Sequence, residues 1–124
     1  MSCAIEKNER GGVVQEEANE EASGIEHSLL QITLRQGVAE EYQRRHDEIW
    51  PEMVDALHAS GFSEMRIFRN EETVSIYSVC HPDAETAWAR LRATEVNSRW
   101  DEAGKDLLAQ PVVLVTSPEI WVLP

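Results

Sequence analysis

Residues 40–53 read Glu40-Glu41-Tyr42-Gln43-Arg44-Arg45-His46-Asp47-Glu48-Ile49-Trp50-Pro51-Glu52-Met53. Apolar residues recur there at steps of three and four, which predicts an amphipathic helix over about 38–60. Charged residues occupy its outer side, and its inner side would carry Val38, Tyr42, His46, Ile49, Met53, Leu57 and Ser60. An imidazole one turn from a phenol on an inward face is what a small buried acid–base site requires.

Pro51 lies in the interior of this predicted helix. A proline there removes the backbone hydrogen bond to the carbonyl of Asp47, and its ring pushes against that carbonyl. We therefore expect a kink just beyond His46, which would tilt the first half of the helix and widen a pocket. Gly61 follows at the position where a glycine commonly ends a helix.

Short β-compatible segments surround this helix in the order of an α+β fold. Apolar residues predict strands over 27–35, 64–68 and 73–80, with a hairpin loop at 69–72. Asp83 is placed to cap a second helical region over 84–109, which is broken near Thr94 and ended by Pro111. Residues 112–115 and 120–123 would form the last strand, with a bend at Ser117-Pro118. This β-α-β-β-α-β order is the ferredoxin-like arrangement, an antiparallel sheet with helices on one face.

A sheet of this size has a second face that its own helices do not cover. An uncovered apolar face of that kind is commonly buried by another protein surface. The simplest cover is a second copy of the chain, so we predict a homodimer whose sheets pack face to face.

Residues 1–26 are rich in glutamate and poor in apolar side chains. Such a segment cannot bury enough surface to offset the entropy of ordering, so we expect a disordered acidic tail over 1–26 and one domain over 27–124. The tail lacks the basic and then apolar order of a signal peptide. Elsewhere no apolar run reaches the roughly 18 residues of a membrane-spanning helix, so no membrane partner is expected.

The chain is acidic, with 23 acidic and 11 basic residues and a net charge of −12. This charge repels phosphate backbones, so we expect no nucleic-acid partner and favour a neutral or cationic small ligand. The two cysteines, Cys3 and Cys80, do not make a disulfide framework, which favours a reducing cytoplasm. The remaining histidines and acids lack metal-ligand spacing, so no metal is expected.

His46 therefore has two interpretations. A single histidine on an apolar helix face is more often a core residue with a satisfied hydrogen bond than a catalyst. The adjacent Tyr42 would also be a core residue if it stood alone. What favours a site is their combination next to Ile49-Trp50-Pro51, because a distorted helix offers space beside an ionisable group.

The run 41–46 followed by Ile49-Trp50-Pro51-Glu52 resembles the signature helix of the L-rhamnose mutarotases. These are small dimeric α/β-barrel proteins of ferredoxin-like topology that interconvert the anomers of L-rhamnose. The resemblance extends over about 29–124 and includes Gly61, the Arg99-Trp100 pair and the closing Val122-Leu123-Pro124. It implies that the chain is a cytoplasmic homodimeric mutarotase acting on a monosaccharide.

The resemblance also implies roles for three residues. His46 would be the general acid, and Tyr42 would hydrogen-bond the sugar. Trp100 matches the first member of a tryptophan pair that packs on the substrate in the family. An indole suits the C–H face and the C6 methyl group of a deoxy sugar.

Two positions depart from the family pattern. Asp101 replaces the second tryptophan of the pair, and Met65 stands where a sugar-contacting tyrosine is found in the strand after the helix. The neighbouring Arg66 would compensate for that tyrosine, so Asp101, Met65 and Arg66 join the expected substrate-binding residues. The altered rim leaves L-fucose, another 6-deoxy sugar, in competition with L-rhamnose.

The chemistry of mutarotation needs no cofactor. A proton is delivered to the ring oxygen and another is removed from the anomeric hydroxyl; the ring opens, C1 rotates about C1–C2, and closure occurs on the other face. An imidazole, whose ordinary pKa is about 6.5, serves either role near neutral pH, with a tyrosine or water as its partner.

Two other classes remain open. The same fold hosts small dimeric oxygenases that act on haem or quinols, and binding of such a molecule would be visible as an absorbance change. A non-catalytic ligand-binding module is the third interpretation. In that case replacing His46 by alanine would lower stability and leave no activity to lose.

Overall fold

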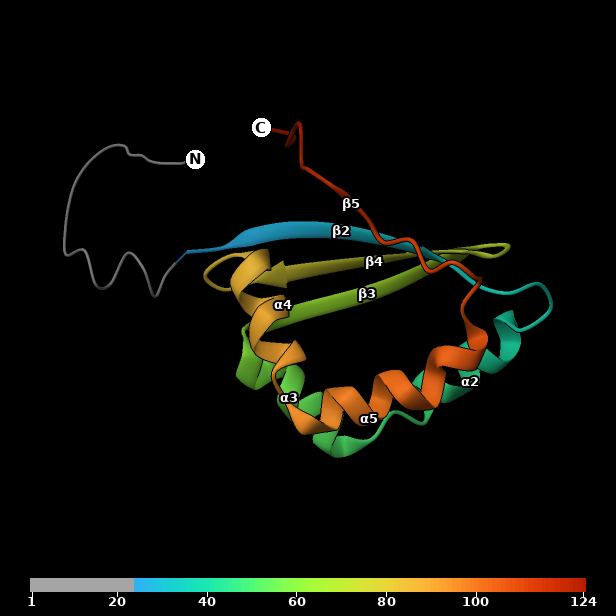
Figure 1. Ribbon diagram of the computed structural model, residues 1–124. Helices are drawn as coiled ribbons and strands as arrows, with labels where there is room; N and C mark the ends of the chain where they lie inside the picture. The colour runs from blue at the N-terminus through green and yellow to red at the C-terminus, as the bar shows by residue number, and fades with distance from the viewer. Residues whose placement is uncertain (1–23) are drawn as a thin grey trace, which may run out of the picture.

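The computed structural model describes residues 24–124 and divides them into a sheet and a layer of helices (Figure 1). In chain order the elements are β2 (Glu26–Thr33), α2 (Ala39–Asp47), α3 (Pro51–Ser60), β3 (Phe62–Asn70), β4 (Thr73–Cys80), α4 (Ala84–Arg92), α5 (Glu95–Gly104), the short 3-10 helix η1 (Lys105–Leu107) and β5 (Val115–Ser117). None of the helices within 24–124 is long and apolar enough to cross a membrane.

The four strands form one antiparallel sheet in the order β3-β4-β2-β5. The two long helical regions return to the same face of that sheet (Figure 1). The predicted α+β, ferredoxin-like fold is therefore confirmed, because helices connect the central strand β2 to the edge strand β3 and the central strand β4 to the edge strand β5, and the hairpin β3–β4 joins the two halves.

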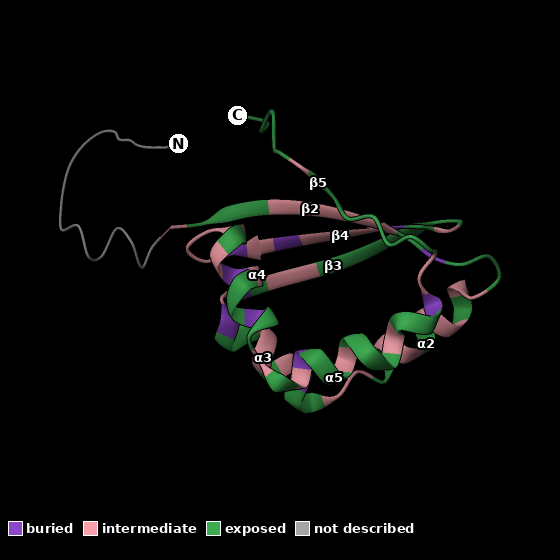
Figure 2. Ribbon diagram, viewed as in Figure 1, coloured by how far each residue is buried: buried purple, intermediate pink, exposed green. Residues whose placement is uncertain are grey.

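The core lies between this face and helices α3 and α4 (Figure 2). Its buried cluster consists of Met53, Phe62, Cys80, Ala87 and Leu91. The ring of Phe62 meets Trp88 edge to face, with centroids 4.9 Å apart. Hydrophobic side chains of α3 and α4 thus hold both helical regions of the chain against the sheet.

The helix predicted over 38–60 is two separate helices, so the chain breaks where only a kink was expected. Trp50 has the extended backbone angles φ −65° and ψ 135°, and Pro51 is the first residue of α3. Proline at the first helical position loses no hydrogen bond, and it disfavours a helical conformation in the residue before it. The inner face survives the break, because Tyr42, His46 and Met53 still face one pocket.

The boundaries at the two ends of the domain also differ from those predicted. The disordered tail was expected to reach Glu26, but Glu26 begins β2 and its carboxylate accepts a hydrogen bond from the Ala84 amide at 2.7 Å. The rest of the predicted tail, residues 1–23 with Cys3, lies outside the described residues. The last strand is only Val115–Ser117, since Pro118 carries no N–H with which to extend the ladder. Residues 120–123 leave the sheet and are exposed.

The cap of α4 was predicted correctly and gives a stability test. Oδ1 of Asp83 accepts a hydrogen bond from the Thr86 amide at 2.7 Å, and this backbone hydrogen bond holds the pKa of Asp83 below its usual range. Asp83→Ala should lower the free energy of unfolding by about 1 kcal/mol at pH 7. Urea unfolding of both proteins measures the difference.

The effect of Asp83 should depend on pH. Because the folded-state pKa is lowered, the cap contributes fully above the unfolded pKa of about 3.9 and is lost as pH falls through the folded value. The difference in free energy of unfolding between wild type and Asp83→Ala should therefore become smaller below about pH 4. Thr94→Ala is the control, because Thr94 caps α5 with a hydroxyl that does not titrate, and its cost should not follow this curve. A pH-independent gap for Asp83→Ala would contradict the assignment.

Candidate active site

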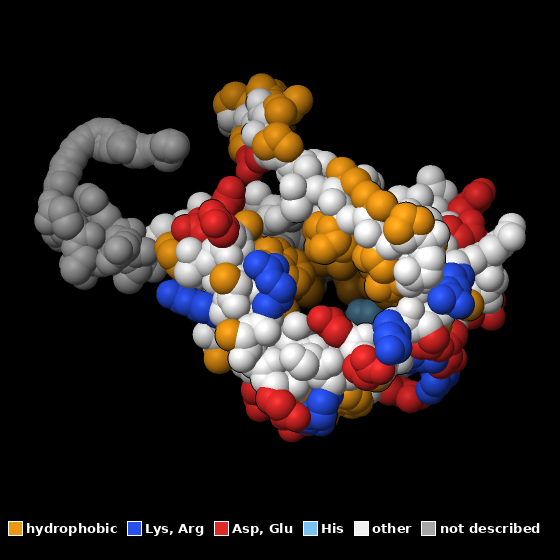
Figure 3. All heavy atoms as spheres, in the orientation of Figure 1, with side chains coloured by type: hydrophobic (Ala, Val, Ile, Leu, Met, Phe, Trp, Pro, Cys, Tyr) orange, Lys and Arg blue, Asp and Glu red, His pale blue; other side chains and the backbone are white. Residues whose placement is uncertain are grey.

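A pocket of about 840 Å³ lies between the sheet and the helices. Its floor is made by alternate residues of three strands, namely Leu30, Ile32, Met65, Ile67 and Ile76. Side chains of a strand alternate between faces, so these residues share the face that carries the helices. Figure 3 shows the hollow, with hydrophobic side chains on its walls and a histidine at its edge.

Tyr42 and His46 project from α2 into this pocket, and Trp100 joins them from α5. The ring centroids of Tyr42 and His46 are 4.4 Å apart. The rings of His46 and Trp100 meet edge to face with centroids 5.4 Å apart. The structure therefore brings together three residues separated in the sequence, in line with the spacing expected for α2 and with the family resemblance for Trp100.

The hydrogen bonding of His46 defines its tautomer. Nδ1 lies 3.0 Å from the carbonyl oxygen of Tyr42, and a carbonyl only accepts, so Nδ1 carries the proton of this bond. The second ring nitrogen, Nε2, is then the one available for proton exchange with a ligand in the pocket.

Tyr42 is suited to donate a hydrogen bond. Removal of water from its surroundings raises the pKa of Tyr42 to about 12. The phenol therefore keeps its proton at neutral pH and can donate to a sugar oxygen, whereas it is a poor base there.

Trp100 is supported from behind. The ring of Trp50 meets it edge to face at 5.2 Å, and the guanidinium of Arg99 lies 5.4 Å from the centroid of the Trp50 ring. Arg99 also pairs with Glu52 at 2.8 Å. These contacts join the break between α2 and α3 to α5 and so hold the indole wall in place.

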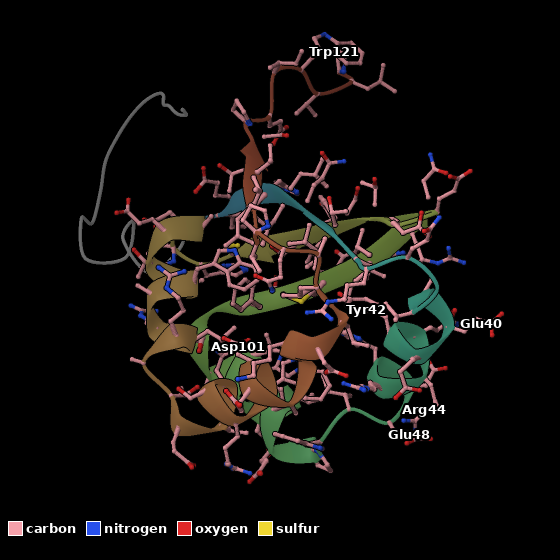
Figure 4. All side chains as sticks on the ribbon, turned by 45° about the vertical axis from the view of Figure 1, so that its right-hand side comes forward. Glu40, Tyr42, Arg44, Glu48, Asp101 and Trp121 are labelled. Atoms are coloured by element: carbon pink, nitrogen blue, oxygen red, sulfur yellow. The ribbon has the colours of Figure 1, made fainter. Side chains whose placement is uncertain are left out.

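Asp101 also lines the pocket, next to Trp100 on α5. Nδ2 of Asn97 donates a hydrogen bond to Oδ2 of Asp101 at 3.2 Å. Figure 4 shows Tyr42 and Asp101 on facing helices beside the space under the sheet. Asn97 was missed at the sequence level; its spacing of four from Asp101, and its position three residues after the cap Thr94, were the available signals.

The two residues of β3 that were expected to bind the sugar lie on different faces of the sheet. Met65 lines the pocket, whereas Arg66 lies on the opposite face of the sheet and pairs with Glu64. Arg66 is thus not placed to compensate for the sugar-contacting tyrosine in this pocket, because neighbouring residues of a strand point to opposite faces.

The charged side of α2 points away from the pocket. Arg44 pairs with Glu41 at 2.6 Å and with Glu48 at 2.9 Å, and Figure 4 shows Arg44 and Glu48 at the outer surface. Arg45 pairs with Glu41 at 2.7 Å and also reaches Asp106 at 3.1 Å, which joins α2 to η1. In the part of the chain from 24 to 124, no group of three His, Cys, Asp or Glu side chains is placed to hold a metal ion.

Comparisons with known proteins point in one direction. A family model described as L-rhamnose mutarotase matches residues 28–121. An L-rhamnose mutarotase of Burkholderia orbicola is 39% identical over 85 residues, which cover 68% of this chain and 82% of the relative.

Solved structures share the fold. That of L-rhamnose mutarotase FA22100 from Formosa agariphila superposes with a TM-score of 0.68 at 24% identity, covering 80% of this chain and 99% of the other. That of SnoaB, a cofactor-independent oxygenase from Streptomyces nogalater, does so with a TM-score of 0.58 at 14% identity, covering 82% and 99%. At these identities the superpositions establish the fold alone.

Proposed function

Since the chain belongs to the L-rhamnose mutarotase family, we propose that it interconverts the α and β anomers of a 6-deoxy-L-hexose, with L-rhamnose as the first candidate and L-fucose as the second. The observation that carries this proposal is the cluster of Tyr42, His46 and Trp100 on the wall of one apolar pocket. That cluster offers a proton donor, a hydrogen-bond donor and an apolar surface for the sugar.

The reaction follows from general acid–base chemistry. In the doubly protonated imidazolium form, Nε2 of His46 gives a proton to the ring oxygen while the anomeric hydroxyl loses its proton to water, and the bond between C1 and the ring oxygen breaks. The open aldehyde rotates about C1–C2. On closure the C5 hydroxyl oxygen attacks the other face of C1 and returns its proton to His46, while the aldehyde oxygen regains the proton that water had taken.

Tyr42 and Trp100 would position the sugar for this step. The phenol of Tyr42, protonated at neutral pH, donates to a sugar oxygen. The indole of Trp100 packs on the apolar C–H face of the ring, as aromatic side chains commonly do. Neither role moves a proton, so each should be less critical than that of His46.

The proposal is tested by saturation-transfer proton NMR of anomer exchange on L-rhamnose and L-fucose. Catalysed exchange on either sugar would support it, and the relative rates would rank the two. No enhancement on either sugar would contradict it. A haem titration followed by absorbance would then test for an oxygenase of the same fold.

We also propose that the protein is a homodimer that joins the outer faces of two sheets. Leu29 and Tyr77 face each other across β2 and β4 on the side opposite the pocket, and Phe68 on β3 is 58% exposed. Trp121, which stands clear of the sheet in Figure 4, is 68% exposed. Large apolar groups that remain exposed, such as Phe68 and Trp121, favour burial against a second chain.

Light scattering at micromolar concentration should therefore give twice the mass of one chain. Phe68→Asp should shift the protein toward the monomer, because a charge buried in the interface lacks a partner. Ala59→Asp introduces the same charge on the exposed side of α3 and should leave the mass unchanged. A monomeric wild type would contradict the dimer.

A further inference from the structure

Asn97 and Asp101 form a polar pair in the otherwise apolar wall of the pocket. They are one turn apart on α5, and both line the pocket. Asn97 is only 6% exposed, so its amide is almost cut off from bulk water. Buried polar groups are nearly always hydrogen-bonded, so a pair in this place calls for a polar partner.

The pair presents hydrogen-bond acceptors. Because a carboxylate only accepts, Asn97 must use Nδ2 to donate to Asp101, which makes its Oδ1 atom a second acceptor. Among residues 24–124, the one hydrogen bond of the Asn97 side chain is the bond to Asp101, which leaves Oδ1 without a donor. Loss of water around Asp101 raises the pKa of its carboxyl, and the hydrogen bond from Asn97 opposes that rise. Two acceptors side by side favour the O–H donors of a ligand.

We propose that Asn97 and Asp101 bind a hydroxyl group on the exocyclic carbon of the sugar, C6. The pair would extend the substrate range from 6-deoxy-L-hexoses to L-hexoses that carry a C6 hydroxyl. This inference rests on the proposed mutarotase function and concerns the specificity of the same pocket.

The chemistry of the sugar favours C6. Trp100, the residue before Asp101, meets His46 edge to face with ring centroids 5.4 Å apart, so the pair follows directly on the indole that lines the wall beside His46. His46 would protonate the ring oxygen, whose carbon neighbours are C1 and C5. The hydroxyl on C1 changes face during the reaction, and the hydroxyl on C2 is present in both kinds of sugar. The substituent of C5, which is C6, carries the hydroxyl that distinguishes a hexose from its 6-deoxy form, so we assign the contact to C6.

A 6-deoxy sugar and a sugar with a C6 hydroxyl differ in whether the Asp101 carboxylate and the Asn97 amide oxygen receive a hydrogen bond. A methyl group at this place would displace water from the carboxylate and the amide oxygen without replacing its hydrogen bonds. A hydroxyl group donates to one of them and so replaces a hydrogen bond that the water had made. The wild-type pocket should therefore accept the sugar with a C6 hydroxyl in addition to the 6-deoxy form.

L-mannose and L-rhamnose provide the test, because they differ only in the hydroxyl on C6. Anomer exchange of both sugars is measured for wild type, Asp101→Leu and the isosteric Asp101→Asn. The ratio of the L-mannose rate to the L-rhamnose rate should fall about 10- to 100-fold in Asp101→Leu, the effect of one hydrogen bond to a charged group. Asp101→Asn keeps an acceptor and should lose less. Glu102→Gln removes the neighbouring charge, which is exposed and paired with Lys105, and should leave the ratio unchanged.

The outcomes separate the two proposals. Exchange of L-rhamnose with an unchanged ratio in Asp101→Leu overturns the hydroxyl subsite and leaves the mutarotase intact. No exchange of either sugar by wild type overturns the mutarotase. Binding of the same two sugars, followed by ligand-observed NMR, then still decides the subsite: a preference for L-mannose that Asp101→Leu removes supports it, and no such preference overturns it.

Discussion

His46→Ala should abolish most of the catalysed anomer exchange, with a loss of about 10²–10⁴-fold, while the protein keeps its fold. The loss follows from the role proposed for Nε2, because no other titratable side chain of the Tyr42–His46–Trp100 cluster exchanges protons readily at neutral pH. The fold should survive, since alanine is a good helix former and His46 contributes one side-chain hydrogen bond, to a backbone carbonyl of its own helix.

Saturation-transfer proton NMR measures the exchange, and circular dichroism checks the fold. His58→Ala is the matched control, because His58 is an exposed histidine on α3 and the same substitution there should leave the rate unchanged. Retention of most activity by His46→Ala would refute its assignment as the acid. An equal loss in His58→Ala would point to a general effect on the protein instead.

Gly61→Ala adds one methyl group and should lower the free energy of unfolding by about 3 kcal/mol or more. Gly61 ends α3 with φ +120°, a conformation that side chains with a Cβ rarely adopt. A Cβ built there would lie 2.2 Å from the carbonyl oxygen of His81. The clash involves backbone, and the Gly61 carbonyl accepts a hydrogen bond from the His81 amide at 2.8 Å, so neither segment moves freely.

Thermal unfolding provides the measurement, and a decrease of more than about 12 °C in Tm is expected for a domain of this size. Gly37→Ala is the control, because Gly37 also has positive φ, at +86°, but a Cβ there meets nothing within 4 Å. That variant should be destabilised only by backbone strain, by about 1 kcal/mol. Similar losses at both positions would show that the contact with His81 is not the cause.

Periodicity was enough to find the centre of the site. Tyr42 and His46 lie four residues apart, and a helix must place such a pair on one face whatever its surroundings. The alternation in 73–80 likewise defined β4, and the Asp83 cap defined the start of α4, because both depend on interactions between near neighbours. The ferredoxin-like order followed from the sequence of these local elements.

Other features depend on distant contacts and were beyond local patterns. Trp50, extended at the break before Pro51, packs against Trp100 and Arg99 from α5. The final strand pairs with β2 only over Leu29 to Gln31. In both cases the partner lies far away in the sequence.

The sequence by itself determined the order of the elements, the inward face of α2 and the Tyr42–His46 pair on it, since each arises from steps of two to four residues. Only the tertiary structure decided what surrounds that pair. It put Met65 in the pocket and Arg66 on the opposite face, and it buried Asn97 beside Asp101. The physical reason is that burial and the loss of water depend on how the sheet and helices close on one another, which no local period of the chain encodes.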